Sequence, residues 1–127
     1  MPEHVHLIVF PEEPTARISG LLCAIKRPTS YRIKQDIFAS KDPLLEKLTI
    51  RERPGKTTFR FWQEGSGYDR NVLDHQSLRR MINYVHLNPV RRGLVDHPRE
   101  WKWSSWQHYE EESNTVDANL PNINVLI

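Results

Sequence analysis

The chain has a single cysteine, Cys23, among its 127 residues. One cysteine excludes a disulfide within the chain and any zinc cluster built on several cysteines. The longest apolar runs, Leu7 to Phe10 and Leu21 to Ile25, fall far short of the roughly 20 residues of a membrane helix. The N-terminus also lacks the basic patch and apolar stretch of a secretory signal. We therefore expect one domain, no membrane partner and a cytoplasmic location.

The motifs of several enzyme classes are absent as well. There is no Gly-rich phosphate-binding loop, no nucleophile elbow and no Cys-x-x-Cys pair. Basic residues are missing from one end: residues 109–127 have no Lys or Arg and four acidic residues, and carry −4. Because the net charge is +2, residues 1–108 carry +6. A basic body that bears aromatic residues is typical of nucleic-acid binding, although many basic domains bind no nucleic acid.

Hydrophobic periodicity predicts an α+β fold. His4 to Phe10 alternates and predicts a strand. Its apolar residues fall on both faces, which favours a place inside an antiparallel sheet with helices packed on it. A helix is predicted after a Thr15 cap, with a kink or break at Pro28. A second helix is predicted to begin at the Asp74 cap, to lie across the strand and to end at Pro89.

Shorter elements are predicted between and after these helices. Residues 44–48 favour a short apolar helix or turn, and Pro54-Gly55 marks a hairpin tip followed by a strand over residues 57–63. Pro98 opens a last short element that holds the three C-terminal tryptophans. Residues 110–127 are acidic and are predicted to form a loose tail.

The first pattern that carries chemistry is His4-Val5-His6. Two histidines at positions i and i+2 of a strand point the same way, so both imidazoles can reach one metal ion. The alternative is two ordinary histidines on one face of a strand. The spacing by itself leaves both interpretations open.

The second pattern joins Tyr84 and Asn88, which are one helical turn apart and therefore share a helix face. The amide oxygen of Asn88 suits a hard cation, and the hydroxyl of Tyr84 can form a covalent intermediate. The alternative is a half-buried tyrosine next to an asparagine that satisfies backbone groups at the end of the helix.

Taken together, the two patterns resemble the signature pair of the REP-associated tyrosine transposases. These are single-tyrosine HUH transposases, similar to insertion-sequence transposases, in which HUH stands for His-hydrophobic-His. The resemblance covers roughly residues 1–109. The stretches that carry it are Met1 to Ile8, Tyr84 to Val95, Trp101 to Trp106 and Phe61-Trp62-Gln63.

The resemblance implies a ferredoxin-like HUH domain over residues 1–109. It implies a DNA transposase that nicks and rejoins single-stranded hairpin DNA through a covalent 5′-phosphotyrosine. Tyr84 would be the nucleophile, and His4, His6 and Asn88 would hold Mg²⁺ or Mn²⁺. The basic residues expected to meet the DNA backbone are Lys26, Arg27, Arg32, Lys34, Arg91 and Arg92.

In the family a strand and a helix precede the HUH strand, so the resemblance implies an N-terminally truncated domain. A missing strand leaves an exposed sheet edge, which a second copy of the chain could cover as a homodimer. Two other functions remain open at this point. One is a truncated, non-catalytic nucleic-acid-binding remnant of such a transposase. The other is a small metal-dependent hydrolase built on His4 and His6, without a tyrosine intermediate.

Overall fold

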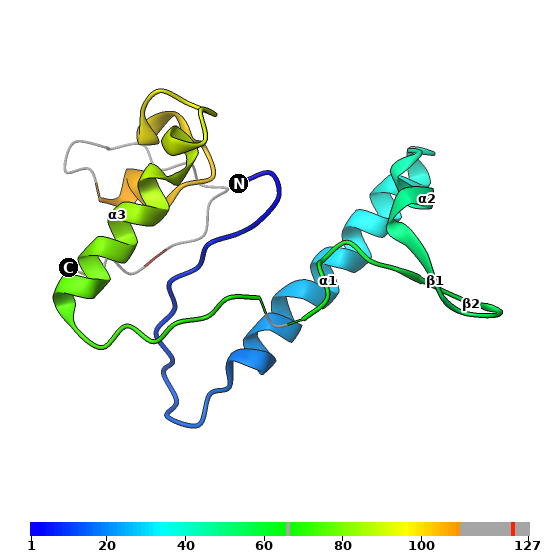
Figure 1. Cartoon of the computed structure of the whole chain (residues 1–127), viewed down its shortest axis with the longest axis horizontal. Helices are drawn as coiled ribbons and strands as arrows, with labels where there is room; N and C mark the ends of the chain where they lie inside the picture. Colours follow the sequence, from blue (N-terminus) through cyan, green and yellow to red (C-terminus); the bar gives the residue numbers. More distant parts are fainter. Residues whose placement is uncertain (66, 110–122, 124–127) are drawn as a thin grey trace. The chain divides into compact units, whose positions relative to one another are not determined.

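The computed structural model describes residues 1–65, 67–109 and 123. The chain forms two compact units. The terminal unit consists of Met1–Val9 and Asn71–Ile127, and the central unit consists of Phe10–Arg70. Their helices and strands are labelled in Figure 1. The described residues contain helices and one two-stranded antiparallel sheet, so the fold is α+β as predicted. None of the helices among them combines the length and apolar character needed to cross a membrane.

The central unit begins with helix α1 (Ile18–Ala39), whose N-cap is Arg17 rather than the predicted Thr15. Of the predicted kink or break at Pro28, the break is wrong, because α1 continues through this residue. Proline has no N–H to donate and so weakens the turn in which it lies. In the same turn the Thr29 hydroxyl donates to the Ile25 carbonyl at 2.6 Å.

Helix α2 (Leu44–Leu48) and a hairpin of β1 (Thr49–Arg53) and β2 (Lys56–Phe59) follow at the end of α1, as Figure 1 shows. The hairpin closes at the predicted corner, where Gly55 has a φ of 77°, a left-handed conformation that favours glycine. The predicted strand over residues 57–63 is too long. β2 ends once β1 offers no further partner, so Phe61-Trp62-Gln63 lies outside the sheet. The paired residues are Thr49–Phe59, Ile50–Thr58, Arg51–Thr57 and Arg53–Lys56.

The main helix of the terminal unit is α3 (His75–Arg91). It begins as predicted, since the Asp74 side chain accepts a first-turn backbone N–H at 2.7 Å. It does not end at Pro89 as predicted, but continues to Arg91. Pro89 lies in the last turn, so it removes a single intrahelical hydrogen bond. The Arg92 N–H still donates to the Asn88 carbonyl at 3.1 Å and closes the helix.

Residues 4–10 form no strand, so the predicted interior strand is wrong for the described part of the chain. The alternating pattern predicts two faces but does not supply a partner, and a strand needs a neighbour to take up its backbone N–H and C=O groups. Within the described residues no segment pairs with it, and the sheet consists of β1 and β2 alone. The side chains of Val5, Leu7 and Val9 are exposed.

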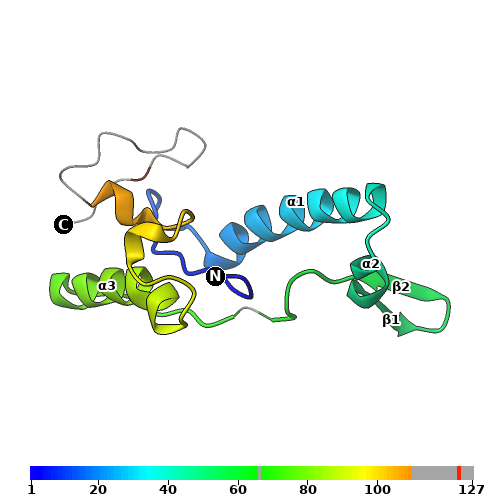
Figure 2. The same ribbon diagram turned by 90° about the horizontal axis from the view of Figure 1, so that it is seen from above.

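Two short 3₁₀ helices, η1 (Pro98–Glu100) and η2 (Ser105–His108), follow α3. Pro98 opens η1 as predicted, but the tryptophans lie outside it. Figures 1 and 2 show this segment beside α3. The predicted tail over residues 110–127 lies outside the described residues except for residue 123. The buried side chains of the terminal unit are on α3 and η1. The buried residues are Ile82, His86, Asn88, Pro89 and Pro98.

Candidate active site

The N-terminal segment and the second half of α3 bring four of the predicted site residues together. The Nε2 atom of His6 lies 3.1 Å from Nε2 of His4 and 2.8 Å from Nδ2 of Asn88. The ring of Tyr84 meets the His6 ring edge-on, with 5.5 Å between the ring centroids. Residues 82 positions apart in the sequence therefore form one cluster, which we call the His–Tyr–Asn cluster.

Simple backbone geometry places these side chains. His4 and His6 lie on the same side of an extended segment, and Val5 between them is exposed. Tyr84 and Asn88 are one turn apart on α3, so both reach the same neighbour. The shared face was predicted from spacing, and it is present even though residues 4–10 have no strand partner in the described chain.

The His–Tyr–Asn cluster is buried at Asn88 and exposed to solvent at Tyr84. Asn88 is 7% exposed, whereas Tyr84 is 41% exposed. Burial lowers the pKa of His6, and the positive charges of His4 and the N-terminal amino group lower it further. The lowered pKa favours the neutral imidazole at neutral pH, and this is the form that binds a metal ion.

The donor atoms fit a small divalent cation. An octahedral Mg²⁺ site with ligands at about 2.1 Å has neighbouring ligands about 3.0 Å apart. The two separations in the cluster, 3.1 Å and 2.8 Å, are close to this value. Asn88 turns its amide nitrogen toward His6, and a half-turn of the amide would present the oxygen instead. Among the described residues no three His, Cys, Asp or Glu side chains form a metal site.

Two adjacent arginines, both predicted to bind DNA, make different contacts at the end of α3. Arg92 forms an ion pair with Glu3, the residue before His4. The guanidinium of Arg91 lies over the Tyr84 ring, with its Cζ 5.6 Å from the ring centroid. Arg92 therefore ties the N-terminal segment to α3, whereas Arg91 contacts the predicted nucleophile.

The sequence pattern missed His86, which is 2% exposed on α3. Its Nε2 lies 2.8 Å from the Ser105 hydroxyl, and the rings of Trp106 and Tyr109 meet it edge-on. Burial lowers the pKa of His86, so its neutral form is favoured. The available signal was its position one turn after Ile82, on the apolar face of the helix. The buried side chain of His86 therefore connects α3 to η2.

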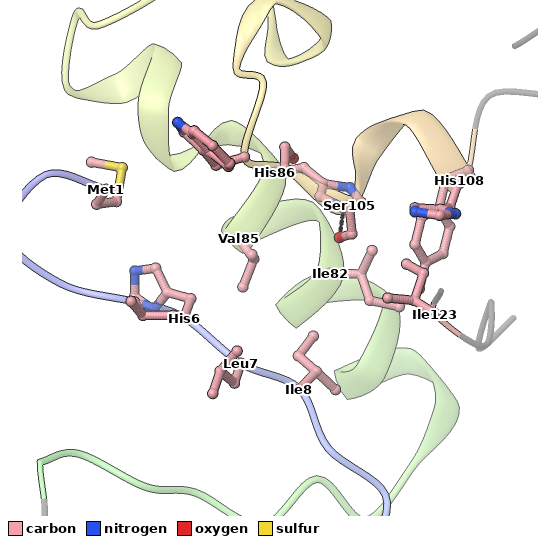
Figure 3. Close-up of a pocket in the computed structure, with 14 residues that line it drawn as sticks. Met1, His6, Leu7, Ile8, Ile82, Val85, His86, Ser105, His108 and Ile123 are labelled. Carbon is pink, nitrogen blue, oxygen red and sulfur yellow. Dashed lines mark hydrogen bonds between the residues drawn. The ribbon is translucent and has the colours of Figure 1, made fainter. Parts of the chain in front are cut away.

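A pocket of about 290 Å³ lies between the N-terminal segment, α3 and η2. Figure 3 shows His6, Leu7 and Ile8 on one side, and Ile82 and Val85 of α3 on another. His6 belongs to both the pocket and the His–Tyr–Asn cluster. Apolar side chains make up much of the pocket lining, so the His–Tyr–Asn cluster lies at the edge of a mainly apolar pocket.

The other four predicted DNA-binding residues lie on α1 in the central unit. The ammonium of Lys26 donates to the Gly65 carbonyl at 3.2 Å, and the indole N–H of Trp62 donates to the Lys26 carbonyl at 3.2 Å. Lys34 lies over a ring of β2. Two of these four residues therefore contact other parts of their own unit. The remaining two residues are exposed, and they are Arg27 and Arg32.

Comparison with known proteins finds a bacterial relative. The chain is 26% identical over 110 residues, or 84% of its length, to a Haemophilus influenzae protein described as a "Putative REP-associated tyrosine transposase". The chain spans about half of that relative, 54% of its length. No protein-family model matches the chain. No solved structure matches it. Over most of its own length, the chain is thus similar to a protein described as a REP-associated tyrosine transposase.

Proposed function

We propose that this chain belongs to the tyrosine transposases and that it nicks and rejoins single-stranded hairpin DNA. The observation that carries the proposal is the His–Tyr–Asn cluster, which brings the Tyr84 ring together with the side chains of His4, His6 and Asn88. The similarity to a protein described as a REP-associated tyrosine transposase supports it. Neither a lone His-x-His pair nor a lone helical tyrosine would suggest this chemistry.

The proposed reaction is a transfer of one phosphodiester bond. The Tyr84 hydroxyl attacks phosphorus, a bond forms between its Oη and phosphorus, and the bond from phosphorus to the 3′ oxygen breaks. The phenolic proton ends on the departing 3′ oxygen. The products are a 5′-phosphotyrosine and a free 3′-hydroxyl, and no bond energy is lost to hydrolysis. Attack by another 3′-hydroxyl reverses the step and rejoins DNA without a further reactant.

The other residues of the cluster would bind a metal ion and orient the phosphate. His4, His6 and Asn88 would hold Mg²⁺ or Mn²⁺, which when bound polarises the phosphate. Because burial lowers the pKa of His6, this imidazole is kept in the neutral form that ligation needs. Arg27 and Arg32 are exposed on α1 and would contact the DNA backbone.

The proposal includes a ferredoxin-like HUH domain. Residues 4–10 have no strand partner among the described residues, and an extended segment with unpaired backbone groups can pair with another chain. A second copy of the chain is one source of such a partner, so a homodimer is part of the proposal. The cytoplasmic location stays a prediction from the sequence.

A second candidate function is DNA binding without cleavage. It is favoured by one observation, the lack of a strand partner for residues 4–10 within the described chain. An unpaired segment holds His4 and His6 less rigidly than a sheet would, and catalysis is sensitive to misplacement of ligands. The two functions differ in whether a covalent protein–DNA product forms.

The test is a search for that product. The protein is incubated with Mn²⁺ and a pool of 3′-labelled single-stranded hairpins with randomised flanks, and then run on a denaturing gel. We expect a covalent protein–DNA band for the wild type and for Tyr31→Phe, which changes an exposed tyrosine of α1. No band is expected for Tyr84→Phe, which keeps the ring and removes the hydroxyl.

Two results would count against the proposal. A band that persists in Tyr84→Phe moves the nucleophile to another tyrosine. A wild-type protein that binds the hairpins but forms no band with Mn²⁺ or Mg²⁺ favours the non-catalytic function.

A further inference from the structure

We propose that Arg91 positions the Tyr84 ring for attack, an inference that rests on the proposed function. The guanidinium carbon of Arg91 lies 5.6 Å from the ring centroid of Tyr84. The two residues are seven positions apart, nearly two full turns, so they lie on the same face of α3. A cation over an aromatic face is attracted by the ring and restricts its orientation.

The Tyr84 ring needs such a restraint because it is 41% exposed. An exposed side chain on a helix can sample several rotamers, and only some direct its hydroxyl toward the His pair. His6 meets the ring edge-on at 5.5 Å, and Arg91 lies over its face. These two contacts together hold the ring next to the proposed metal ligands.

Arg91 is also free to act on the substrate, in contrast to its neighbour. Arg92 is paired with Glu3, whereas Arg91 is exposed and its contact is with the neutral Tyr84 ring. A guanidinium group presents a planar fork of donors that matches the oxygens of a phosphate. Arg91 would therefore meet the phosphate that Tyr84 attacks and align the hydroxyl with phosphorus, a role distinct from general contact with the DNA backbone.

The first measurement does not depend on activity. The protein is labelled with 3-fluorotyrosine, and the ¹⁹F resonance of Tyr84 is assigned as the one missing from Tyr84→Phe. We expect Arg91→Gln to shift this resonance and to leave the other tyrosines in place. The matched control is Arg79→Gln, which removes the same charge from an exposed site near the start of α3 and should leave the Tyr84 resonance unchanged.

The second measurement is the rate of covalent adduct formation at saturating labelled hairpin DNA with Mn²⁺. We expect Arg91→Gln to slow this step roughly 10- to 100-fold, since small misplacements of a reacting group have effects of this size. Its affinity for DNA should fall by much less than the rate. Arg91→Lys keeps the charge but not the planar fork, and should recover part of the rate.

Three outcomes separate the inference from the proposed function. If Arg91→Gln equals Arg79→Gln in both the Tyr84 resonance and the rate, Arg91 does not position the ring. A loss of DNA affinity as large as the loss of rate would make Arg91 an ordinary backbone contact, which also overturns the inference. If the resonance shifts but the wild type forms no adduct, positioning by Arg91 stands and the proposed function fails.

Discussion

The two units of this chain differ in amino-acid composition and in burial. All six histidines lie in the terminal unit, whereas five of the six lysines lie in the central unit. Among the described residues, the buried ones belong to the terminal unit and none belongs to the central unit. The central unit is a helix, a short helix and a hairpin, and its hydrogen bonds between distant residues join α1 to the segment after β2. The terminal unit is held by contacts between distant segments.

This difference explains where chemistry can occur. A buried polar group must find a partner, so burial fixes the geometry of Asn88 and His86. An exposed cation has no such requirement, and the arginines of α1 can adapt to a ligand of variable shape. The terminal unit therefore holds the candidate site in a defined geometry, whereas the exposed arginines of α1 are accessible to a ligand.

The largest expected effect is the loss of cleavage when His6 is replaced. His6→Ala removes the imidazole that touches both His4 and Asn88, so Mn²⁺-dependent cleavage of labelled hairpin DNA should be abolished. DNA binding, measured by fluorescence anisotropy, should be largely kept because charge supplies most of the affinity. His75→Ala, at an exposed site at the start of α3, is the control. Loss of binding together with cleavage, without unfolding, would refute the ligand assignment.

The next effect concerns the central unit. Replacing Arg27 and Arg32 with Gln should weaken binding to single-stranded DNA without changing the cleaved bond. For single strands the salt dependence of binding should become shallower by about 0.7 for each phosphate that the protein no longer neutralises. The control replaces Arg51 and Arg53 of β1 with Gln and removes the same charge from the same unit. Equal salt slopes for the two double variants would rule out a DNA-binding face around these α1 arginines.

A smaller effect is expected on stability. Ser105→Ala leaves the buried His86 without its hydroxyl partner at 2.8 Å and should lower the free energy of unfolding by about 1–3 kcal/mol. The matched variant in the central unit is Ser40→Ala, whose exposed hydroxyl bonds to the Asp36 carbonyl, and its cost should stay within about 0.5 kcal/mol. Urea denaturation followed by tryptophan fluorescence measures both. Equal losses in the free energy of unfolding would contradict the proposed difference in burial between the two units.

The smallest effect is a dependence of stability on pH. Burial lowers the folded-state pKa of His86 below its ordinary value of 6.5. Between the two values the unfolded chain binds more protons, so stability is fully present above about 6.5 and falls as the pH drops toward the folded-state pKa. Urea midpoints from pH 7 to pH 5 should decline in the wild type and in His75→Gln. The decline of the urea midpoint should be less steep in His86→Gln. An equally steep decline in this variant would exclude His86 as a cause of the pH dependence.

Local features were predictable from the sequence because their causes span a few residues. The Asp74 cap bonds within its own first turn, and the Gly55 corner depends on a single φ angle. The one-turn spacing of Tyr84 and Asn88 likewise follows from helix geometry. Rules that consider one residue alone were less reliable. Pro28 was predicted to kink or break α1, but the helix continues through this residue.

The sequence by itself determined which side chains share a face: His4 with His6, and Tyr84 with Asn88. Only the tertiary structure decided that these two faces meet and that His86 pairs with Ser105. It also decided that residues 4–10 lack a strand partner in the described chain. The physical reason is that periodicity is a property of one segment, whereas a contact or a ladder depends on how two segments distant in sequence pack.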